Sequence, residues 1–174
     1  LVVLSSAGHR HADVDLDDPN FDDSPYDKWQ AYGRAKTANV LFANEFDRRY
    51  AARGVRAFAV HPGTIATELG RHLTAEDIAI LRGRSSNSND KSEPSERPRA
   101  IRRWKSVAAG AATTVWAATS ASLDGLGGCY LEDCGVGEID DSADAPRGYR
   151  SYATDPDRAA ALWALSASLV GIQP

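Results

Sequence analysis

Several features that would narrow the function of this chain are scarce or missing. No apolar run approaches the roughly 20 residues that a membrane-spanning helix requires, so we expect no membrane span. The two cysteines, Cys129 and Cys134, are too few for a disulfide framework, which predicts a reduced, cytoplasmic setting. The formal net charge is -4, so the composition gives no reason to expect nucleic acid as a partner.

Methionine is absent as well, although the chain has 174 residues and could bury a substantial core. The opening letters LVVLSS already read as the middle of a buried strand, and a domain rarely begins inside its own core. We therefore expect residues 1–174 to be part of one larger domain. The hydrophobic fraction of 43% and the charged fraction of 25% are ordinary for a globular protein.

The first third of the chain predicts a strand, a helix and a second strand. The apolar run at 1–6 ends in small polar residues, which is typical of a strand buried on both faces of a parallel sheet. An acidic, turn-rich loop follows, and then apolar residues recur at three- and four-residue steps from about 26–28 to 52, which predicts a helix ended by Gly54. A second buried strand, VRAFAVHPG, ends at Pro62 and Gly63. This order is the βαβ signature of an α/β fold.

The remainder predicts shorter elements around a polar insertion. Thr74 and the acidic residues after it indicate a short helix, and 84–99 is low in apolar residues and is expected to be a flexible insertion. A helix of small residues at 106–123, a turn and short strand at 125–133, and a terminal helix between Asp155 and Gly171 complete the prediction.

The stretch YGRAK places a phenol and an ammonium four residues apart. Tyr32 and Lys36 would therefore project from one face of the predicted helix, near its start. An ammonium beside a phenol favours the phenolate, and a phenol tuned in this way can exchange a proton near neutral pH. A Tyr-x-x-x-Lys pair is common by chance, so its neighbours decide its meaning. In a parallel sheet the ends of the two predicted strands, SSAG and HPG, lie at the edge where such folds bind ligands.

Three segments, VVLSSAGH, YGRAKTANVLFANEF and VRAFAVHPGTIATELGRHL, together resemble the short-chain dehydrogenase/reductase family. The second and third are most similar to its branch of retinol dehydrogenase-like and protochlorophyllide reductase-like proteins. The likeness covers nearly the whole chain apart from the insertion. It implies a Rossmann-type parallel sheet with flanking helices, and hydride transfer between NAD or NADP and a small-molecule carbonyl or alcohol substrate.

The resemblance also implies roles for individual residues. Ser6 would hydrogen-bond the substrate carbonyl, with Ser5 as the rival assignment. Tyr32 would be the acid in reduction and the base in oxidation, and Lys36 would hold the nicotinamide ribose and tune Tyr32. The segment that borders the nicotinamide would comprise Pro62, Gly63, Thr64, Ile65 and Thr67. No metal site is implied.

One part of the family pattern is absent. The glycine-rich turn that binds the dinucleotide after a first strand does not occur, since GLGG at 125–128 follows a helix and precedes a strand. The resemblance therefore implies a C-terminal half in which the N-terminal half of the fold is missing. We expect this chain alone neither to fold stably nor to turn over substrate, because a sheet edge would be bare and cofactor affinity reduced. The preference between NAD and NADP is not readable.

Two alternatives remain open. The chain could be a non-catalytic remnant that acts by subunit pairing, because the Tyr32-bearing helix commonly lies in the homo-oligomer interface of this family. It could also bind anions through the basic stretch from Arg84 to Arg103. The histidines His9, His11 and His72 are expected to line the mouth of a substrate site.

Overall fold

The computed structural model describes residues 1–65, 67–75, 77, 104–143 and 145–172. The predicted insertion at 84–99, the basic stretch from Arg84 to Arg103 and nearly all of the helix predicted after Thr74 lie outside these residues.

A mainly parallel sheet forms the centre of the described structure. It contains β1 (Val2–Leu4), β2 (Phe58–His61), β3 (Cys129–Glu132) and β4 (Gly135–Val136), in the spatial order β1-β2-β3-β4. The first three strands are parallel, and β4 returns antiparallel to β3. The predicted α/β class is confirmed, whereas β4 was not predicted.

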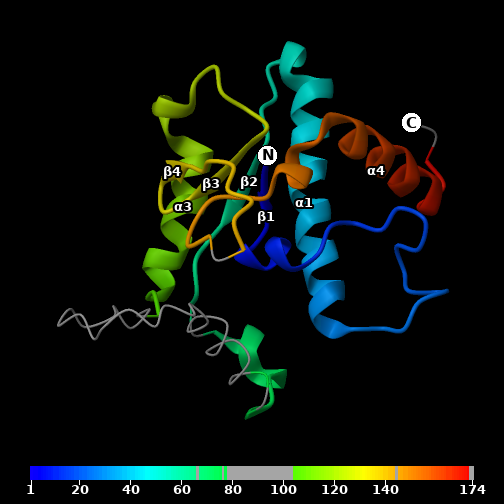
Figure 1. Ribbon diagram of the computed structural model, residues 1–174. Coiled ribbons are helices and arrows are strands. Elements are labelled where there is room, and N and C mark those ends of the chain that lie inside the picture. The colour runs from blue at the N-terminus through cyan, green and yellow to red at the C-terminus, as the bar shows by residue number, and fades with distance from the viewer. Residues whose placement is uncertain (66, 76, 78–103, 144, 173–174) are drawn as a thin grey trace.

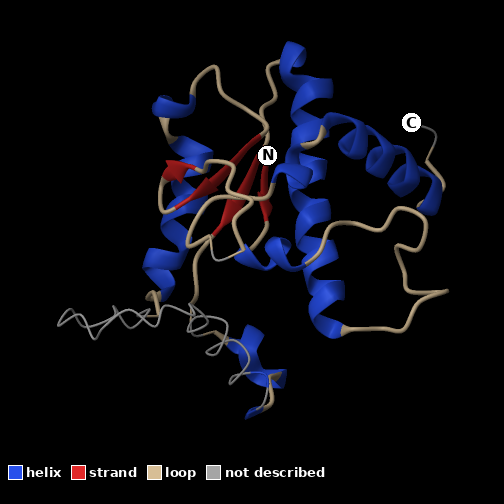
Figure 2. Cartoon of the chain, in the orientation of Figure 1, coloured by secondary structure: helices blue, strands red, loops and turns tan. Residues whose placement is uncertain are grey.

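Helices cover both faces of this sheet. Helix α1 (Lys28–Tyr50) and helix α4 (Pro156–Leu169) lie on one side, and helix α3 (Val107–Thr119) lies on the other (Figures 1 and 2). Short 3-10 turns connect these elements: η1 (Ala7–His11), η2 (Ala51–Arg53), η3 (Glu68–His72), η4 (Ala121–Leu123) and η5 (Ser151–Thr154). The result is a three-layer arrangement in which α1 joins β1 to β2.

Local sequence explains where α1 begins and ends. The Asp27 carboxylate caps the helix by accepting hydrogen bonds from the amides of Trp29 and Gln30. The helix passes into η2, and Gly54 then adopts a left-handed conformation with φ of 77°. The prediction of a helix ended by Gly54 is therefore confirmed, with the last turn tightened to a 3-10 turn.

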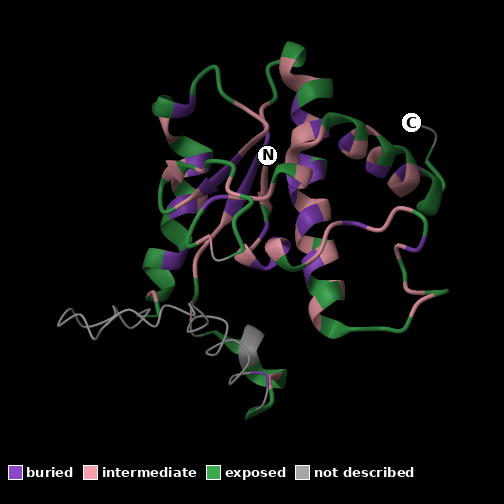
Figure 3. Ribbon diagram, viewed as in Figure 1, coloured by how far each residue is buried: buried purple, intermediate pink, exposed green. Residues whose placement is uncertain are grey.

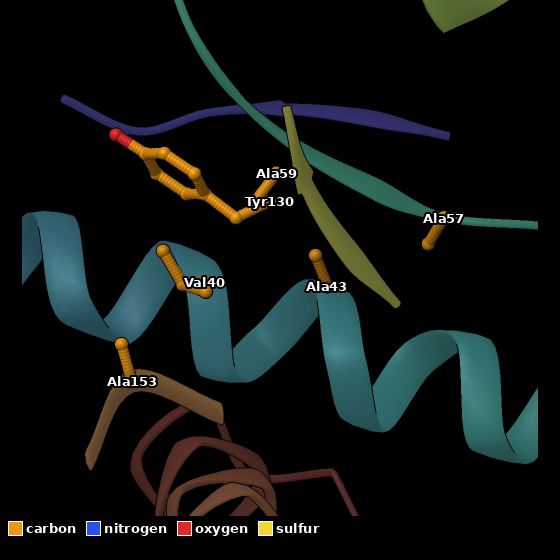
Figure 4. Packing of buried hydrophobic residues seen from close by; sticks show 6 residues of the cluster. All are labelled: Val40, Ala43, Ala57, Ala59, Tyr130 and Ala153. Atoms are coloured by element: carbon orange, nitrogen blue, oxygen red, sulfur yellow. The ribbon is translucent and has the colours of Figure 1, made fainter. Parts of the chain in front are cut away.

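The core includes one apolar layer on each face of the sheet. Figure 4 shows Val40 and Ala43 of α1 directed at the sheet, where the Tyr130 ring lies, with Ala153 beneath the helix. The other layer is formed by Phe58, Val60, Leu131, Ala117 and Leu123. Figure 3 shows that buried residues gather on the strands and on the inward side of α1.

The prediction that the first strand is buried on both faces is wrong. Val2 and Val3 are half-buried, and Leu4 is 50% exposed. Among the described strands β1 pairs only with β2, so it forms the edge of the sheet, whereas β2 lies between two neighbours. The sequence pattern records the apolar character of the strand but not its position in the sheet.

Candidate functional site

Three segments meet at the carboxyl edge of the sheet. Because β1 and β2 are parallel, Ser5 and Ser6 at the end of β1 lie beside the residues that end β2. The Ser5 amide extends the pairing by donating to the Val60 carbonyl at 2.8 Å. The first half of α1 packs against η1, which directly follows the two serines.

The two serines have different surroundings. Ser5 is 3% exposed, and its hydroxyl donates to the Lys36 carbonyl at 2.8 Å. Ser6 is half-buried, and its hydroxyl oxygen accepts a 3.0 Å hydrogen bond from the Gly8 amide as the cap of η1. Ser5 thus joins β1 to α1, while the Ser6 hydroxyl keeps its own hydrogen available at the edge of the sheet.

Gly8 is the point where Ser6 and Tyr32 approach each other. A Cβ atom placed on Gly8 would lie 2.4 Å from Cε1 of Tyr32 and 3.4 Å from Oγ of Ser6. The Tyr32 ring therefore rests on the Gly8 backbone, which only glycine permits, and the serine hydroxyl borders the same spot. Tyr32 is 36% exposed, so its ring is accessible to a small molecule.

Lys36 lies one helical turn beyond Tyr32. Its Nζ atom is 5.6 Å from the Tyr32 ring centroid, within cation–π range. The same ammonium donates to the Leu4 carbonyl at 3.3 Å, and Asn39 Nδ2 donates to that carbonyl at 2.8 Å. Partial burial lowers the pKa of Lys36 below its usual value. The end of β1 is thus fastened to α1 beside the lysine.

His61 connects the two strand ends. Its Nδ1 atom accepts from the Ala7 amide at 3.3 Å and from the Gly63 amide at 3.4 Å. The ring therefore holds the segment after β1 next to the segment after β2, as a structural histidine.

The segment after β2 contacts Lys105, which comes from a distant part of the chain. Gly63 has a φ of 91°, and a Cβ there would lie 2.7 Å from the Lys105 side chain. The Lys105 ammonium donates to the Pro62 carbonyl at 3.4 Å and pairs with Asp133 at 2.5 Å. The Lys105 amide donates to the Thr64 carbonyl at 2.9 Å, and Ile65 bridges to Lys105 and packs on Gly110.

The structure thus brings Ser6, Tyr32 and Lys36 to one edge, with the Pro62–Ile65 stretch beside them. Thr64 and Thr67 are exposed, and Thr67 follows a residue that is not described. The expectation that His9 lines a substrate mouth is wrong, because its side chain is fully buried. Two contributing residues were missed, Asn39 and Lys105. The position of Asn39, three residues after Lys36 and on the same helix face, is a signal that could have been used.

A cavity of about 520 Å³ lies elsewhere, at the opposite end of the strands. It is bordered by Leu1, Val2, Arg56 and Gly125 and includes none of the predicted site residues. The described helices include none that is both long and apolar enough to cross a bilayer.

Relatives of known type match almost the whole chain. It is 39% identical over 176 residues to the oxidoreductase calI of Penicillium decumbens, covering 99% of this chain and 48% of that protein. It is 36% identical to the short-chain dehydrogenase/reductase prx1 of Penicillium rubens, with 99% and 47% covered. It is 31% identical to human retinol dehydrogenase 14, with 99% and 44% covered. No family model matches the chain.

A solved structure agrees in fold. The crystal structure of an uncharacterized protein from Mycobacterium paratuberculosis superposes with a TM-score of 0.60 at 28% identity, covering 99% of this chain and 50% of that one. The chain spans about half the length of the curated relatives it matches. The sheet and this half-length match confirm the prediction of a Rossmann-type α/β chain that covers one half of such a fold. By its sequence and its fold, the chain belongs to the short-chain dehydrogenase/reductase family.

Proposed function

We propose that this chain carries the catalytic half of an NAD(P)-dependent oxidoreductase that interconverts a carbonyl and an alcohol. The observation that supports it is the meeting of the Ser6 hydroxyl and the Tyr32 ring over Gly8, with the Lys36 ammonium 5.6 Å from that ring. A hydroxyl, a phenol and an ammonium around one accessible spot are the groups that proton transfer to a carbonyl oxygen requires.

The residues present suit a nicotinamide nucleoside. Lys36 has three N–H donors, of which one points to the Leu4 carbonyl, so donors remain for the two hydroxyls of a ribose. The Pro62–Ile65 stretch offers backbone groups beside it, and the Lys105 side chain fills the space next to Gly63. When bound, the cofactor would supply or accept the hydride. Lys36, Pro62, Gly63, Thr64, Ile65 and Thr67 would hold its nicotinamide end.

The chain's own residues would then move one proton. In reduction, the Tyr32 hydroxyl donates its proton to the substrate oxygen as the carbonyl carbon gains a hydride, and the phenolate that forms is stabilised by the Lys36 ammonium. Tyr32 regains a proton from solvent, which its exposure permits. In oxidation the phenolate accepts the alcohol proton.

Ser6 would orient the substrate. Its oxygen is already held by the Gly8 amide, so its remaining hydrogen can point outward to the substrate carbonyl. Ser5 is unsuited to this role because its hydroxyl is buried and donates to Lys36.

A test that does not depend on the adenosine half of the cofactor follows from this assignment. Purified chain would be titrated with reduced nicotinamide mononucleotide, which lacks adenosine, while amide and side-chain NMR signals are recorded. We expect shifts at Lys36, Thr64 and Ile65, and loss of these shifts in Lys36→Met. Lys28→Met, on the same helix but paired with Asp77, is the matched control and should bind normally.

Turnover is measured separately with NADH and NADPH against a panel of aldehydes and ketones. Tyr32→Phe should reduce any carbonyl reduction by roughly 10²–10⁴-fold without changing the unfolding midpoint, because general acid catalysis is worth that much. A Tyr32→Phe variant as active as the parent chain would contradict the assignment.

A second candidate is a non-catalytic chain that pairs with an intact subunit through α1. The absence of a glycine-rich turn from the sequence favours it. Sedimentation of the chain mixed with a full-length homologous enzyme would distinguish the two, because this candidate requires a mixed complex and no nucleotide-dependent shifts at Lys36.

A further inference from the structure

His9 is a buried histidine whose two ring nitrogens both contact backbone groups. Nδ1 lies 2.7 Å from the Ser6 carbonyl oxygen, and Nε2 lies 3.3 Å from the Arg150 amide nitrogen. A carbonyl can only accept and an amide N–H can only donate, so Nδ1 must carry the hydrogen while Nε2 carries none. Together the two contacts specify the neutral ring with one tautomer.

The backbone of His9 is held equally firmly. Its carbonyl accepts from the Tyr152 hydroxyl at 2.7 Å and lies 3.1 Å from the buried Thr37 hydroxyl, whose hydrogen it shares with the Ala12 carbonyl at 2.7 Å. The neighbouring Arg10 donates to the carbonyls of Gly148 and Ala145. The turn η1 is therefore bound on one side to α1 and on the other to the chain just before and within η5.

The start of η1, which these contacts hold in place, lies next to the Ser6 hydroxyl and the Tyr32 ring of the candidate site. The Ser6 carbonyl accepts from both the His9 amide, at 3.1 Å, and the His9 ring, which fixes the peptide group attached to Ser6. Gly8, one residue before His9, carries the Tyr32 ring. A shift of His9 would therefore move the Ser6 hydroxyl and the support of the Tyr32 ring together.

We propose that His9 is a positioning residue for the Ser6–Tyr32 pair, which it holds by linking the Ser6 carbonyl to the segment Arg150–Tyr152. This inference rests on the proposed function only for its effect on turnover, because the link itself is structural. The C-terminal segment thereby helps to position the site, although it begins 141 residues after His9 in the sequence.

The surroundings of the ring agree with a neutral histidine. Burial is the main cause that lowers the pKa of His9, to about 4, and the charges of Arg10, Arg150 and His11 act in the same direction. The centroid of the Tyr130 ring lies 5.1 Å from the centroid of the His9 ring, and the Tyr152 hydroxyl donates to the His9 carbonyl. None of these groups is a carboxylate that would favour imidazolium.

The first experiment reads the tautomer directly in the full chain. Long-range ¹H–¹⁵N correlation spectra of the imidazole should show Nδ1 as the protonated nitrogen and Nε2 as the bare one, unchanged from pH 8 to pH 5.5. A ring protonated at Nε2, or one that titrates near its ordinary value, would overturn the proposal because neither contact could then exist as described.

A second experiment separates the two contacts. An asparagine amide can replace the Nδ1 donor but cannot reach Arg150, so His9→Asn should speed hydrogen exchange at the Arg150 amide at least tenfold while the Gly8 amide is unaffected. His9→Phe removes both contacts and should speed exchange at both amides. Equal exchange rates in the parent and His9→Phe would overturn the proposal.

The effect on chemistry is measured with whichever nucleotide supports turnover. His9→Asn should lower kcat less than tenfold and His9→Phe more than tenfold, with the KM for the nucleotide unchanged in both. If no turnover is observed, the proposed function fails while the tautomer and exchange results still decide the positioning role. A His9→Phe variant with unaltered kcat but accelerated exchange would overturn the catalytic part.

Discussion

The ends of β1 and β2 lie side by side, yet they are built differently. After β1, short hydrogen bonds reach α1 and the C-terminal segment: the Ser5 hydroxyl donates to the Lys36 carbonyl at 2.8 Å, and the Tyr152 hydroxyl donates to the His9 carbonyl at 2.7 Å. After β2 the contacts from side chains to backbone are longer, at 3.3 and 3.4 Å for His61 and 3.4 Å for Lys105, although the Lys105 amide donates to the Thr64 carbonyl at 2.9 Å. Thr64 is exposed.

This difference corresponds to the two proposed roles. A hydroxyl that orients a carbonyl must be fixed before the substrate arrives, because mispositioning by about 1 Å can cost on the order of 10²-fold in rate. Backbone that borders a cofactor can adjust around it. We therefore expect the end of β1 to be rigid in the free chain and the end of β2 to be adaptable, and four predictions test this contrast.

Acid destabilisation through His9 should be the strongest of the four effects. Its pKa is about 4 in the folded chain and 6.5 when exposed, so only the unfolded chain takes up this proton as pH falls between those values. The stabilisation is complete above about pH 6.5 and is lost progressively toward pH 4, by up to roughly 3 kcal/mol. Urea unfolding at a series of pH values measures it.

His9→Asn is the control, because the slope of stability between pH 6.5 and 4 should flatten in that variant. Asp77, whose pKa is lowered to about 2 mainly by its hydrogen bond with Lys28, loses stabilisation only below about pH 4 and so does not interfere. A slope that persists in His9→Asn would mean that other groups cause it.

Gly8→Ala should disturb the rigid end next most strongly. The new methyl group would overlap the Tyr32 ring, so the ring must leave its place, at a stability cost of about 1–3 kcal/mol. Thermal unfolding and carbonyl reduction should both decline. Gly135→Ala is matched, because its nearest contact would be an ordinary 3.6 Å, and it should change neither quantity.

Ser5→Ala should mainly lower stability, whereas Ser6→Ala should mainly lower turnover. Ser5→Ala removes the buried hydrogen bond from the Ser5 hydroxyl to the Lys36 carbonyl and should lower the free energy of unfolding by about 1–2 kcal/mol. Ser6→Ala should change stability less but reduce turnover more. Denaturant unfolding and steady-state kinetics measure the two effects. The assignment is contradicted if Ser5→Ala mainly lowers turnover and Ser6→Ala mainly lowers stability.

Lys105→Met probes the adaptable end and should have the smallest effect on stability, less than about 1 kcal/mol for a partly exposed pair. The hydrogen bond from Lys105 is the main cause that lowers the pKa of Asp133, so that pKa should rise toward its ordinary value. NMR titration of Asp133 measures the change. Arg147→Gln, which removes a more distant and exposed partner at 3.6 Å, should produce a smaller rise.

The part of the site that the sequence predicted is the part with a short-range cause. Tyr32 and Lys36 share a helix face because of the 3.6-residue period, and Ser6 follows an apolar run that ends in polar residues. The choice between Ser5 and Ser6 could not be made from the amino-acid sequence, since either serine could face α1. It depends on the pairing of Ser5 with Val60 and on the packing of α1.

Contacts across long stretches of chain were not predictable. Lys105 reaches Gly63 across a long stretch of sequence whose middle lies outside the described residues, and His9 meets Arg150 at a separation of 141. The sequence predicted a bare sheet edge but did not assign that edge to β1, because alternation and apolar runs describe a strand without stating how many neighbours it has.

The α/β class, the capped helix that carries Tyr32 and Lys36, and the two strand ends that flank it could all be predicted from the sequence. These follow from periodicity, capping and turn chemistry, which act between residues a few positions apart. Three properties depend on the folded chain: which serine hydroxyl keeps its hydrogen available, the burial of His9, and the contacts of the C-terminal segment with the serine turn. Such properties depend on burial and on hydrogen bonds between segments that become neighbours only when the sheet and its covering helices have packed.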